Sequence, residues 1–89
     1  MPRLEYSDRF TRDLARVTSS KVEARIYTAL DNVEAFGDFG SKIVPDSIRE
    51  EFGDGVRKVA ADPLDLMYSY FPDNDLVRIE ALIHQRAAR

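Results

Sequence analysis

The chain has 89 residues, of which 44% are hydrophobic and 33% are charged, and these values predict one soluble globular domain over residues 1–89. It contains no cysteine, which excludes disulfides and thiolate zinc sites and fits a reducing compartment. Its apolar runs are too short to span a membrane and its N-terminus lacks the apolar core of a signal peptide, so we expect a cytoplasmic protein without membrane contact.

The charges are distributed unevenly along the chain. The formal net charge is −3, and residues 31–54 hold two basic and seven acidic groups, whereas residues 1–30 hold six basic and four acidic groups. Proteins that bind nucleic acids usually carry a basic surplus or a basic face. The acidic middle segment would repel a phosphate backbone, so the charge pattern argues against broad nucleic-acid binding.

The N-terminal part predicts a short strand followed by a helix. Residues 3–6 alternate polar and apolar side chains, which is typical of a strand. Ser7 stands where an N-cap residue is expected, and Phe10, Leu14 and Val17 then recur at the spacing of one helix face.

A second helix is expected to begin near residue 20. Ser20 and Glu23 fit a capping box, and Gly37 is expected to end the helix. Helical spacing is shown by the apolar residues Val22, Ile26, Ala29, Leu30 and Val33. Two helices joined by so few residues predict an antiparallel hairpin, which must bury an apolar face against a sheet.

Residues 37–54 are interrupted by glycine and proline and predict a connecting segment rather than a linker between domains. One helical turn is expected within it at residues 46–52, with Asp46 as its cap.

Three strands are predicted in the last third of the chain, at residues 55–61, 64–71 and 76–85. The middle one is apolar or aromatic on both faces, which predicts a central strand. The turn before the last strand contains Asp73 and Asn74, and both residue types tolerate positive φ.

Alternation in the last strand predicts two distinct faces. One face is formed by Val77, Ile79, Ala81 and Ile83, and the other by Arg78, Glu80, Leu82, His84 and Arg86. The elements together predict an α+β fold, in which the N-terminal helical hairpin packs on one face of a small twisted antiparallel sheet and the opposite face stays partly open.

Five segments carry a resemblance to a known family: Gly37–Ser41, Gly55–Val59, Pro63, Leu66–Tyr68 and Leu82–Arg86. In their order and spacing they resemble the RelE/ParE superfamily of bacterial toxins, and the ParE-like members more than the RelE-like ones. The resemblance covers nearly the whole chain. It implies a growth-inhibiting toxin of a type II toxin–antitoxin system, neutralised by a cognate antitoxin protein. RelE-like members cut messenger RNA on the ribosome, and ParE-like members poison DNA gyrase.

The resemblance also implies which residues would cut RNA without a metal ion. Lys58 matches a strand lysine of the RelE-like members, and Arg86 matches the arginine of their final strand. Asp65 stands where these members have an arginine, Val56 and Ala60 replace further basic residues, and the tail lacks the tyrosine. A carboxylate repels a phosphate, so this departure argues against efficient RNA cleavage.

His84 is the only histidine and completes the candidate catalytic set of Lys58, His84 and Arg86, although an exposed or structural histidine is the simpler interpretation. Adjacent Arg57 and Lys58 must point to opposite faces, so only one of them can join such a cluster. Tyr68 and Tyr70 are expected in the core, with their hydroxyls at the rim of the sheet.

Candidate partner-binding residues are Met67 and Phe71 on the open face, and Arg86 and Arg89 near the C-terminus. No phosphate-binding glycine loop, nucleophile elbow or zinc motif is present, so we expect no cofactor and no metal. Poisoning of gyrase is the leading hypothesis, and a ribosome-dependent endoribonuclease is the alternative. A third hypothesis is a degenerate member that only binds an antitoxin. The apolar open face is also compatible with a homodimer.

Overall fold

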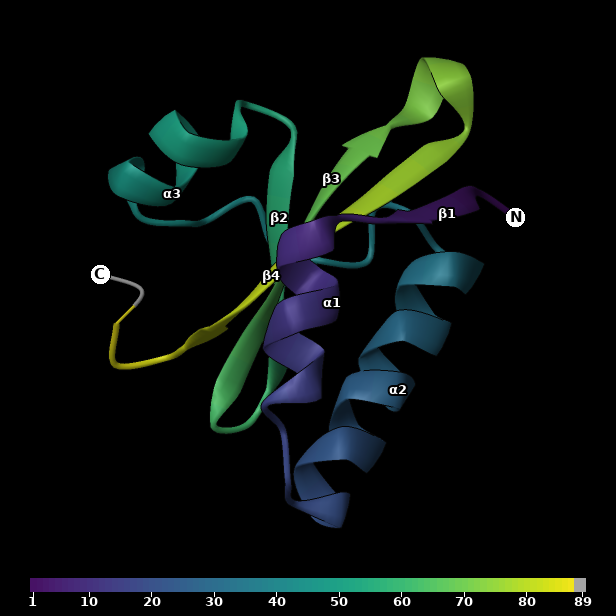
Figure 1. Ribbon diagram of the computed structural model, residues 1–89. Coiled ribbons are helices and arrows are strands. Elements are labelled where there is room, and N and C mark those ends of the chain that lie inside the picture. Colours follow the sequence, from purple (N-terminus) through teal and green to yellow (C-terminus); the bar gives the residue numbers. More distant parts are fainter. Residues whose placement is uncertain (88–89) are drawn as a thin grey trace.

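The structure, a computed structural model, describes residues 1–87. Helices and strands follow the order that the sequence predicts (Figure 1). Their bounds are β1 Arg3–Tyr6, α1 Asp8–Ala15, α2 Ser20–Ala35, α3 Asp46–Phe52, β2 Val56–Ala61, β3 Leu64–Phe71 and β4 Leu76–His84, with a 3₁₀ turn Pro72–Asn74 before β4.

The four strands form one sheet in the order β1-β4-β3-β2. β2, β3 and β4 are antiparallel neighbours, as predicted, but β1 runs parallel to β4. The sheet is therefore mixed rather than purely antiparallel. The reason is that the whole helical hairpin lies between β1 and the rest of the sheet in sequence, so β1 reaches its place through a long crossover instead of a tight turn.

α1 and α2 form the predicted antiparallel hairpin and lie side by side against the sheet, while α3 lies near β2 (Figure 1). Ser7 is the N-cap of α1, and its hydroxyl accepts a hydrogen bond from the Phe10 N–H at 3.0 Å. The prediction for α2 is wrong by one residue, because Ser19 and not Ser20 is its N-cap and accepts from the Val22 N–H at 3.3 Å.

The end of α2 and the start of α3 also differ from the prediction. α2 ends at Ala35 with Phe36 as its C-cap residue, so Gly37 is not the cap. Gly37 instead lies against the ring of Tyr70, where any β-carbon would collide with it. α3 forms at the predicted residues, but its N-cap is Pro45, and the Asp46 side chain makes no capping hydrogen bond.

Two hydrophobic clusters lie on opposite faces of the sheet. The first joins the sheet to α1 and α2, and we call this side the helix face; its buried residues are Phe10, Ile26, Ala29, Leu30, Val33, Ala61, Leu66, Tyr68, Val77, Ile79 and Leu82. The second joins the sheet to α3, and we call this side the second face; its buried residues are Val44, Ile48, Val56, Met67 and Ala81.

The alternation predicted for β4 breaks at Glu80. Met67 pairs with Ala81 and Tyr68 pairs with Ile79, so Glu80 has no partner on β3 and forms a β-bulge. The bulge shifts the alternation by one residue. Ile79 and Leu82 therefore lie on the helix face, whereas Ala81 lies on the second face, which corrects the assignment made from the sequence pattern.

The turn between β3 and β4 falls where it was predicted, but its geometry differs. Positive φ occurs at Asp75, with a value of 49°, and not at Asp73 or Asn74, which lie in the 3₁₀ turn. A 3₁₀ turn keeps φ negative within it, so the left-handed residue is the one that follows.

Candidate functional site

The second face of the sheet is only partly open, because α3 covers one end of it. Ile48 of α3 and Val44 before it pack on Val56 and Met67. Arg9 of α1 holds α3 in place by pairing with Glu51 and lying over the ring of Phe52 at 5.4 Å from its centroid. The uncovered part of the second face lies toward the other end of β2 and β3.

A hollow of about 490 Å³ occupies this uncovered part, and we call it the Asp65 hollow. Its lining consists of Ser41, Lys58, Ala60, Asp65 and Gln85. Ala60 is paired directly with Asp65 across β2 and β3, and its small side chain leaves space beside the carboxylate. The small side chain of Ala60 therefore contributes to the hollow.

Asp65 is 7% exposed, which is unusual for a carboxylate. The Gln85 side-chain amide donates to Asp65 Oδ1 at 3.3 Å, to Asp62 Oδ1 at 2.6 Å and to the Leu64 carbonyl at 3.4 Å. One amide group has two hydrogens for these three acceptors. The Asp65 carboxylate is therefore weakly satisfied and retains acceptor capacity toward the hollow.

Arg57 and Lys58 point to opposite faces, as predicted. Arg57 lies on the helix face, where its Nη1 donates to the carbonyls of Gly40 at 2.9 Å and Asp38 at 3.2 Å and its guanidinium lies 6.0 Å from the Tyr70 ring centroid. Lys58 lines the Asp65 hollow. Only the lysine of this pair is therefore available to a ligand on the second face.

The structure does not bring the three candidate catalytic residues together. Lys58 pairs with Met67 and so lies on the second face, whereas His84 pairs with Leu64, whose side chain packs on the helix face. His84 Nδ1 accepts a hydrogen bond from the Arg86 N–H at 3.2 Å, which gives the histidine a role in the turn after β4. Arg86 is exposed in that turn.

The candidate partner-binding residues have different environments. Met67 is fully buried under α3, so the expectation that a partner contacts it directly is wrong for this arrangement of α3. Phe71 is 36% exposed and lies 5.5 Å from the Arg78 guanidinium, in the part of the sheet farthest from the Asp65 hollow along β3. Arg86 is accessible, and Arg89 lies outside the described residues.

The hydroxyl of Tyr68 is buried and not at the rim of the sheet, which corrects the expectation from sequence. It accepts a hydrogen bond from the Gly40 N–H at 2.6 Å and donates to the Gly37 carbonyl at 2.8 Å. Burial raises the pKa of Tyr68, although the hydrogen bond from Gly40 and the charge of Arg57 act in the opposite direction. A neutral phenol that makes two hydrogen bonds in this position fixes the loop after α2. It is not poised to transfer a proton.

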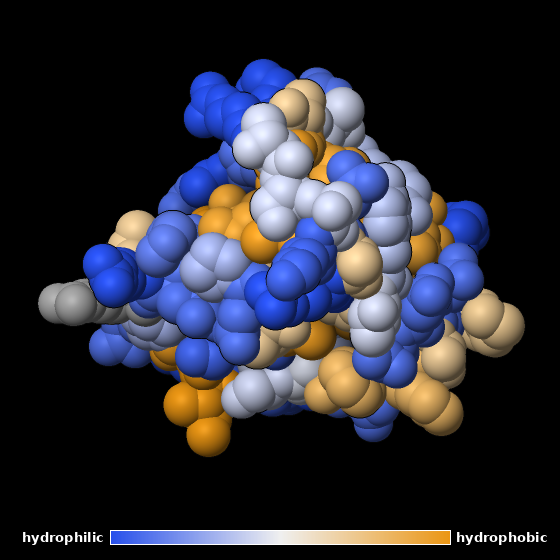
Figure 2. All heavy atoms as spheres, turned by 90° about the horizontal axis from the view of Figure 1, so that it is seen from below, coloured by the Kyte–Doolittle hydropathy of each residue, from blue (hydrophilic) through white to orange (hydrophobic). Residues whose placement is uncertain are grey.

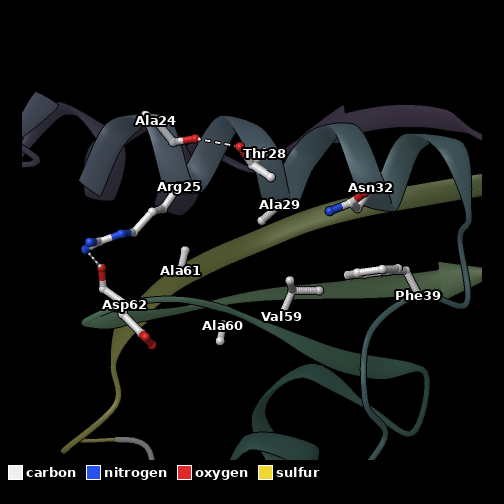
Figure 3. Close-up of a pocket in the computed structure, with 10 residues that line it drawn as sticks. All are labelled: Ala24, Arg25, Thr28, Ala29, Asn32, Phe39, Val59, Ala60, Ala61 and Asp62. Atoms are coloured by element: carbon white, nitrogen blue, oxygen red, sulfur yellow. Dashed lines mark hydrogen bonds between the residues drawn. The ribbon is translucent and has the colours of Figure 1, made fainter. Parts of the chain in front are cut away.

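A second hollow, of about 380 Å³, lies on the helix face between α2 and β2 (Figure 3). Val59 and Ala61 of β2 point into it toward α2, Phe39 lies at one end, and Arg25 reaches across the other end to the Asp62 carbonyl at 2.9 Å. We call it the α2–β2 hollow. Its lining is mainly apolar and contains several alanines, so it can accept an apolar side chain.

The surface at the end of the molecule shown in Figure 2 mixes both kinds of residue. Apolar atoms are visible in gaps between hydrophilic side chains, and they do not form one continuous area. Within residues 1–87, no three histidine or acidic side chains are grouped closely enough to hold a metal ion. None of the helices in this part of the chain has the length and apolar character that crossing a bilayer requires.

Gln85, Ser41 and Ala60 were not predicted as site residues. The bulge at Glu80 shifts the alternation of β4 and so changes the face onto which Gln85 projects. A prediction from regular alternation cannot reveal such a shift. Ser41 reaches β2 through an isolated bridge to Lys58. Only the replacement of basic residues by Ala60 and Asp65 was visible in the sequence.

Comparison with known proteins places the fold but not a family. No protein-family model matches the chain, and no curated protein matches its sequence. Its structure is similar to the crystal structure of the isolated E. coli RelE toxin, with a TM-score of 0.70 and 11% sequence identity over 94% of this chain and 84% of that chain. The chain therefore has a RelE-like toxin fold.

Proposed function

We propose that this protein is the toxin component of a type II toxin–antitoxin system and is held inactive by a cognate antitoxin. The likeness to the E. coli RelE toxin in fold supports this proposal. It is also supported by the resemblance of five sequence segments, in order, to the RelE/ParE superfamily. Fold alone does not fix an activity, so the mode of action has to be argued from the residues of the site.

We further propose that the protein acts by binding a protein target, and that this target is DNA gyrase. The observation that supports this choice is that a buried carboxylate, Asp65, lines the same hollow as Lys58. Metal-free RNA cleavage requires cations around the scissile phosphate, and the loss of one such donor costs roughly 3–4 kcal/mol of transition-state stabilisation. Here a carboxylate occupies one such position, and His84 lies on the other face.

The test is a supercoiling assay with purified gyrase, relaxed plasmid and the purified protein. We expect loss of supercoiling, with cleaved plasmid accumulating, at protein concentrations that match gyrase. The same preparation after heat denaturation is the control. Growth arrest on inducible expression, with DNA synthesis failing before protein synthesis, would agree with this mode. Undisturbed supercoiling would contradict it.

A ribosome-dependent endoribonuclease is the second candidate function. The specific observation in its favour is that the structural match is to a RelE toxin. The residues expected for this mode are Lys58 and Arg86 for the phosphate and His84 for the proton, although Lys58 and His84 lie on opposite faces of the sheet.

The second candidate predicts cleavage of messenger RNA in a translating extract. Cleavage should disappear in Arg86→Ala and persist in Arg3→Ala, which removes an arginine from the distant β1 strand. Primer extension on the transcript measures both. Intact transcripts with the wild-type protein would exclude this candidate and leave the gyrase proposal standing.

A further inference from the structure

β2 is an edge strand, and one position on its outer edge is open. The Lys58 N–H donates to the Ser41 carbonyl and the Lys58 carbonyl accepts from the Ser41 N–H, both at 3.0 Å, so the Lys58 backbone points away from β3. Backbone groups two residues apart in a strand point the same way, so those of Ala60 also point outward. Asp62, the next outward position, has its carbonyl bonded to Arg25.

Within residues 1–87 no backbone group pairs with the outward N–H and carbonyl of Ala60. Sheet edges with free backbone groups are the sites at which extended peptides add to a sheet. The edge of β2 is therefore closed on both sides of Ala60 and receptive at Ala60 itself.

The two hollows lie on either side of this open position. Ala60 lines both of them, the α2–β2 hollow on the helix face and the Asp65 hollow on the second face. Figure 3 shows Val59 and Ala61 pointing toward α2 and Ala60 pointing the opposite way. An extended peptide paired with Ala60 would project its side chains alternately to the two faces, so it would fill both hollows at once.

We propose that the β2 edge binds an extended segment of a partner protein with the pattern apolar–arginine–apolar. The arginine pairs with Ala60 and points to the second face, toward Asp65. Its two neighbours point to the helix face, and one of them enters the α2–β2 hollow. The backbone of the arginine residue exchanges hydrogen bonds with the N–H and carbonyl of Ala60.

Charge selects the central residue. The Asp65 carboxylate is short, buried and fixed, and it has acceptor capacity left over from its long hydrogen bond with Gln85. Asp62, which also binds the Gln85 amide, adds a second carboxylate nearby. Lys58 opposes a cation, but its four-carbon stem allows the ammonium to move into water, whereas Asp65 cannot move. A guanidinium therefore fits this hollow better than a carboxylate or a phosphate.

The experiment uses the full chain labelled with ¹⁵N and the synthetic peptide acetyl-Thr-Val-Arg-Val-Thr-amide. We expect chemical-shift changes at Val59, Ala60 and Asp65 and none at the opposite sheet edge, β1. Replacing the central arginine of the peptide by glutamate should weaken binding by about fivefold or more, because the charge partner is partly buried. Methylation of the arginine backbone nitrogen should abolish binding.

Two variants separate the contributions of charge and backbone. Asp65→Asn keeps the shape of the side chain and should remove the preference for arginine over glutamate. Ala60→Pro removes the outward N–H without touching the hydrogen bonds to β3, and it should prevent binding. Asp73→Asn, which alters an acidic residue in the 3₁₀ turn between β3 and β4, is the matched control and should change nothing. Circular dichroism of each variant verifies that it is folded.

Three outcomes would overturn the inference. They are equal binding of the arginine and glutamate peptides, shifts confined to residues away from β2, and concentration-dependent dimerisation that buries Ala60 against a second copy. The identification of the peptide with an antitoxin segment rests on the proposed toxin function. Peptide binding is measured without gyrase or ribosomes. A negative result in the peptide titration therefore does not bear on the supercoiling and translation assays, and negative results in those assays do not bear on the peptide titration.

Discussion

A single side chain, Tyr68, holds the loop after α2 against the sheet. Inside the core its hydroxyl accepts a hydrogen bond from the Gly40 N–H and donates one to the Gly37 carbonyl. The loop can approach so closely only because these two residues lack side chains; a β-carbon on Gly40 would lie 2.7 Å from a ring carbon of Tyr68. The same loop carries Ser41 to the edge of β2, so the geometry of the candidate site depends on this tyrosine.

Tyr68→Phe should destabilise the protein by about 2–4 kcal/mol, because two buried backbone groups lose their hydrogen-bond partner. Urea denaturation at neutral pH measures the change in the free energy of unfolding. Tyr27→Phe, which alters a half-exposed tyrosine on α2, is the control and should have little effect. An equal effect of the two substitutions would contradict the role assigned to the Tyr68 hydroxyl.

The contribution of Tyr68 should also depend on pH. Its folded-state pKa is raised above 10.0, the usual tyrosine value, chiefly by burial. A raised pKa means that the folded state favours the neutral phenol, so the stabilisation is complete below pH 10.0 and is lost as the pH rises through the folded-state pKa. The stability difference between wild type and Tyr68→Phe should therefore shrink at strongly alkaline pH. A difference that stays constant there would contradict this expectation.

Among the elements, β4 and α1 depend on each other. β1 pairs with β4 only as far as Ile79, and α1 with its N-cap residue supplies partners for backbone groups of β4 beyond that point. The Ser7 hydroxyl donates to the Glu80 carbonyl at 2.7 Å, and the Asp13 carboxylate accepts from the Leu82 N–H at 3.0 Å. The helix thereby stabilises the shift in alternation that places Leu82 in the core.

Asp13→Ala should lower the free energy of unfolding by about 2 kcal/mol, since it leaves the Leu82 N–H without its charged acceptor. Asp13→Asn keeps an acceptor oxygen at the same place and should retain most of the stability. Chemical denaturation of the two variants provides the measurement. If both substitutions cost the same, the negative charge near Arg9 and not the hydrogen bond to β4 would be the stabilising feature.

The elements themselves were largely predictable because their signals are local. Helical spacing in α2 and alternation in β2 depend only on neighbouring residues, and both helices lie within a residue or two of their predicted bounds. The bulge in β4 was not predictable, since Glu80 differs in no obvious way from a surface residue of a regular strand. The burial of Met67 was missed because residues 46–52 offer only two apolar side chains, Ile48 and Phe52, which are too few to reveal that α3 would cover the sheet.

The candidate site was partly visible in the sequence. Asp65 and Ala60 stood out as departures from the resembling family, and Arg57 and Lys58 were correctly expected on opposite faces of β2. The separation of Lys58 and His84 onto opposite faces follows from strand register, which one strand taken alone does not reveal. The open backbone of Ala60 depends on the Ser41 bridge, a contact between segments that have no common motif.

At the scale of the whole molecule, charge sets what the protein can approach. The net charge is −3, and α3 carries three acidic residues. The Asp65 hollow contributes a further carboxylate. Long-range attraction of a phosphate backbone is therefore weak, whichever cations lie on the sheet.

We accordingly expect the Kd for non-specific single-stranded RNA at physiological salt to exceed ~10⁻⁴ M, which is the weak end of the usual range. Fluorescence anisotropy of a labelled oligonucleotide measures this affinity, and a salt titration reports the number of phosphate contacts. Micromolar binding with a steep salt dependence would contradict the electrostatic argument and would favour the endoribonuclease candidate.

The parallel pairing of β1 with β4 has a consequence for the order in which the protein can be made. Ser7, at the end of β1, bonds to Glu80, a separation of 73 positions. During synthesis β1 therefore cannot pair with β4 until almost the whole polypeptide has been produced. Contacts so distant in sequence slow folding, and until they form the apolar side of the hairpin stays uncovered. A nascent chain stalled before residue 76 cannot complete its sheet, so no partial product of translation should possess the folded surface.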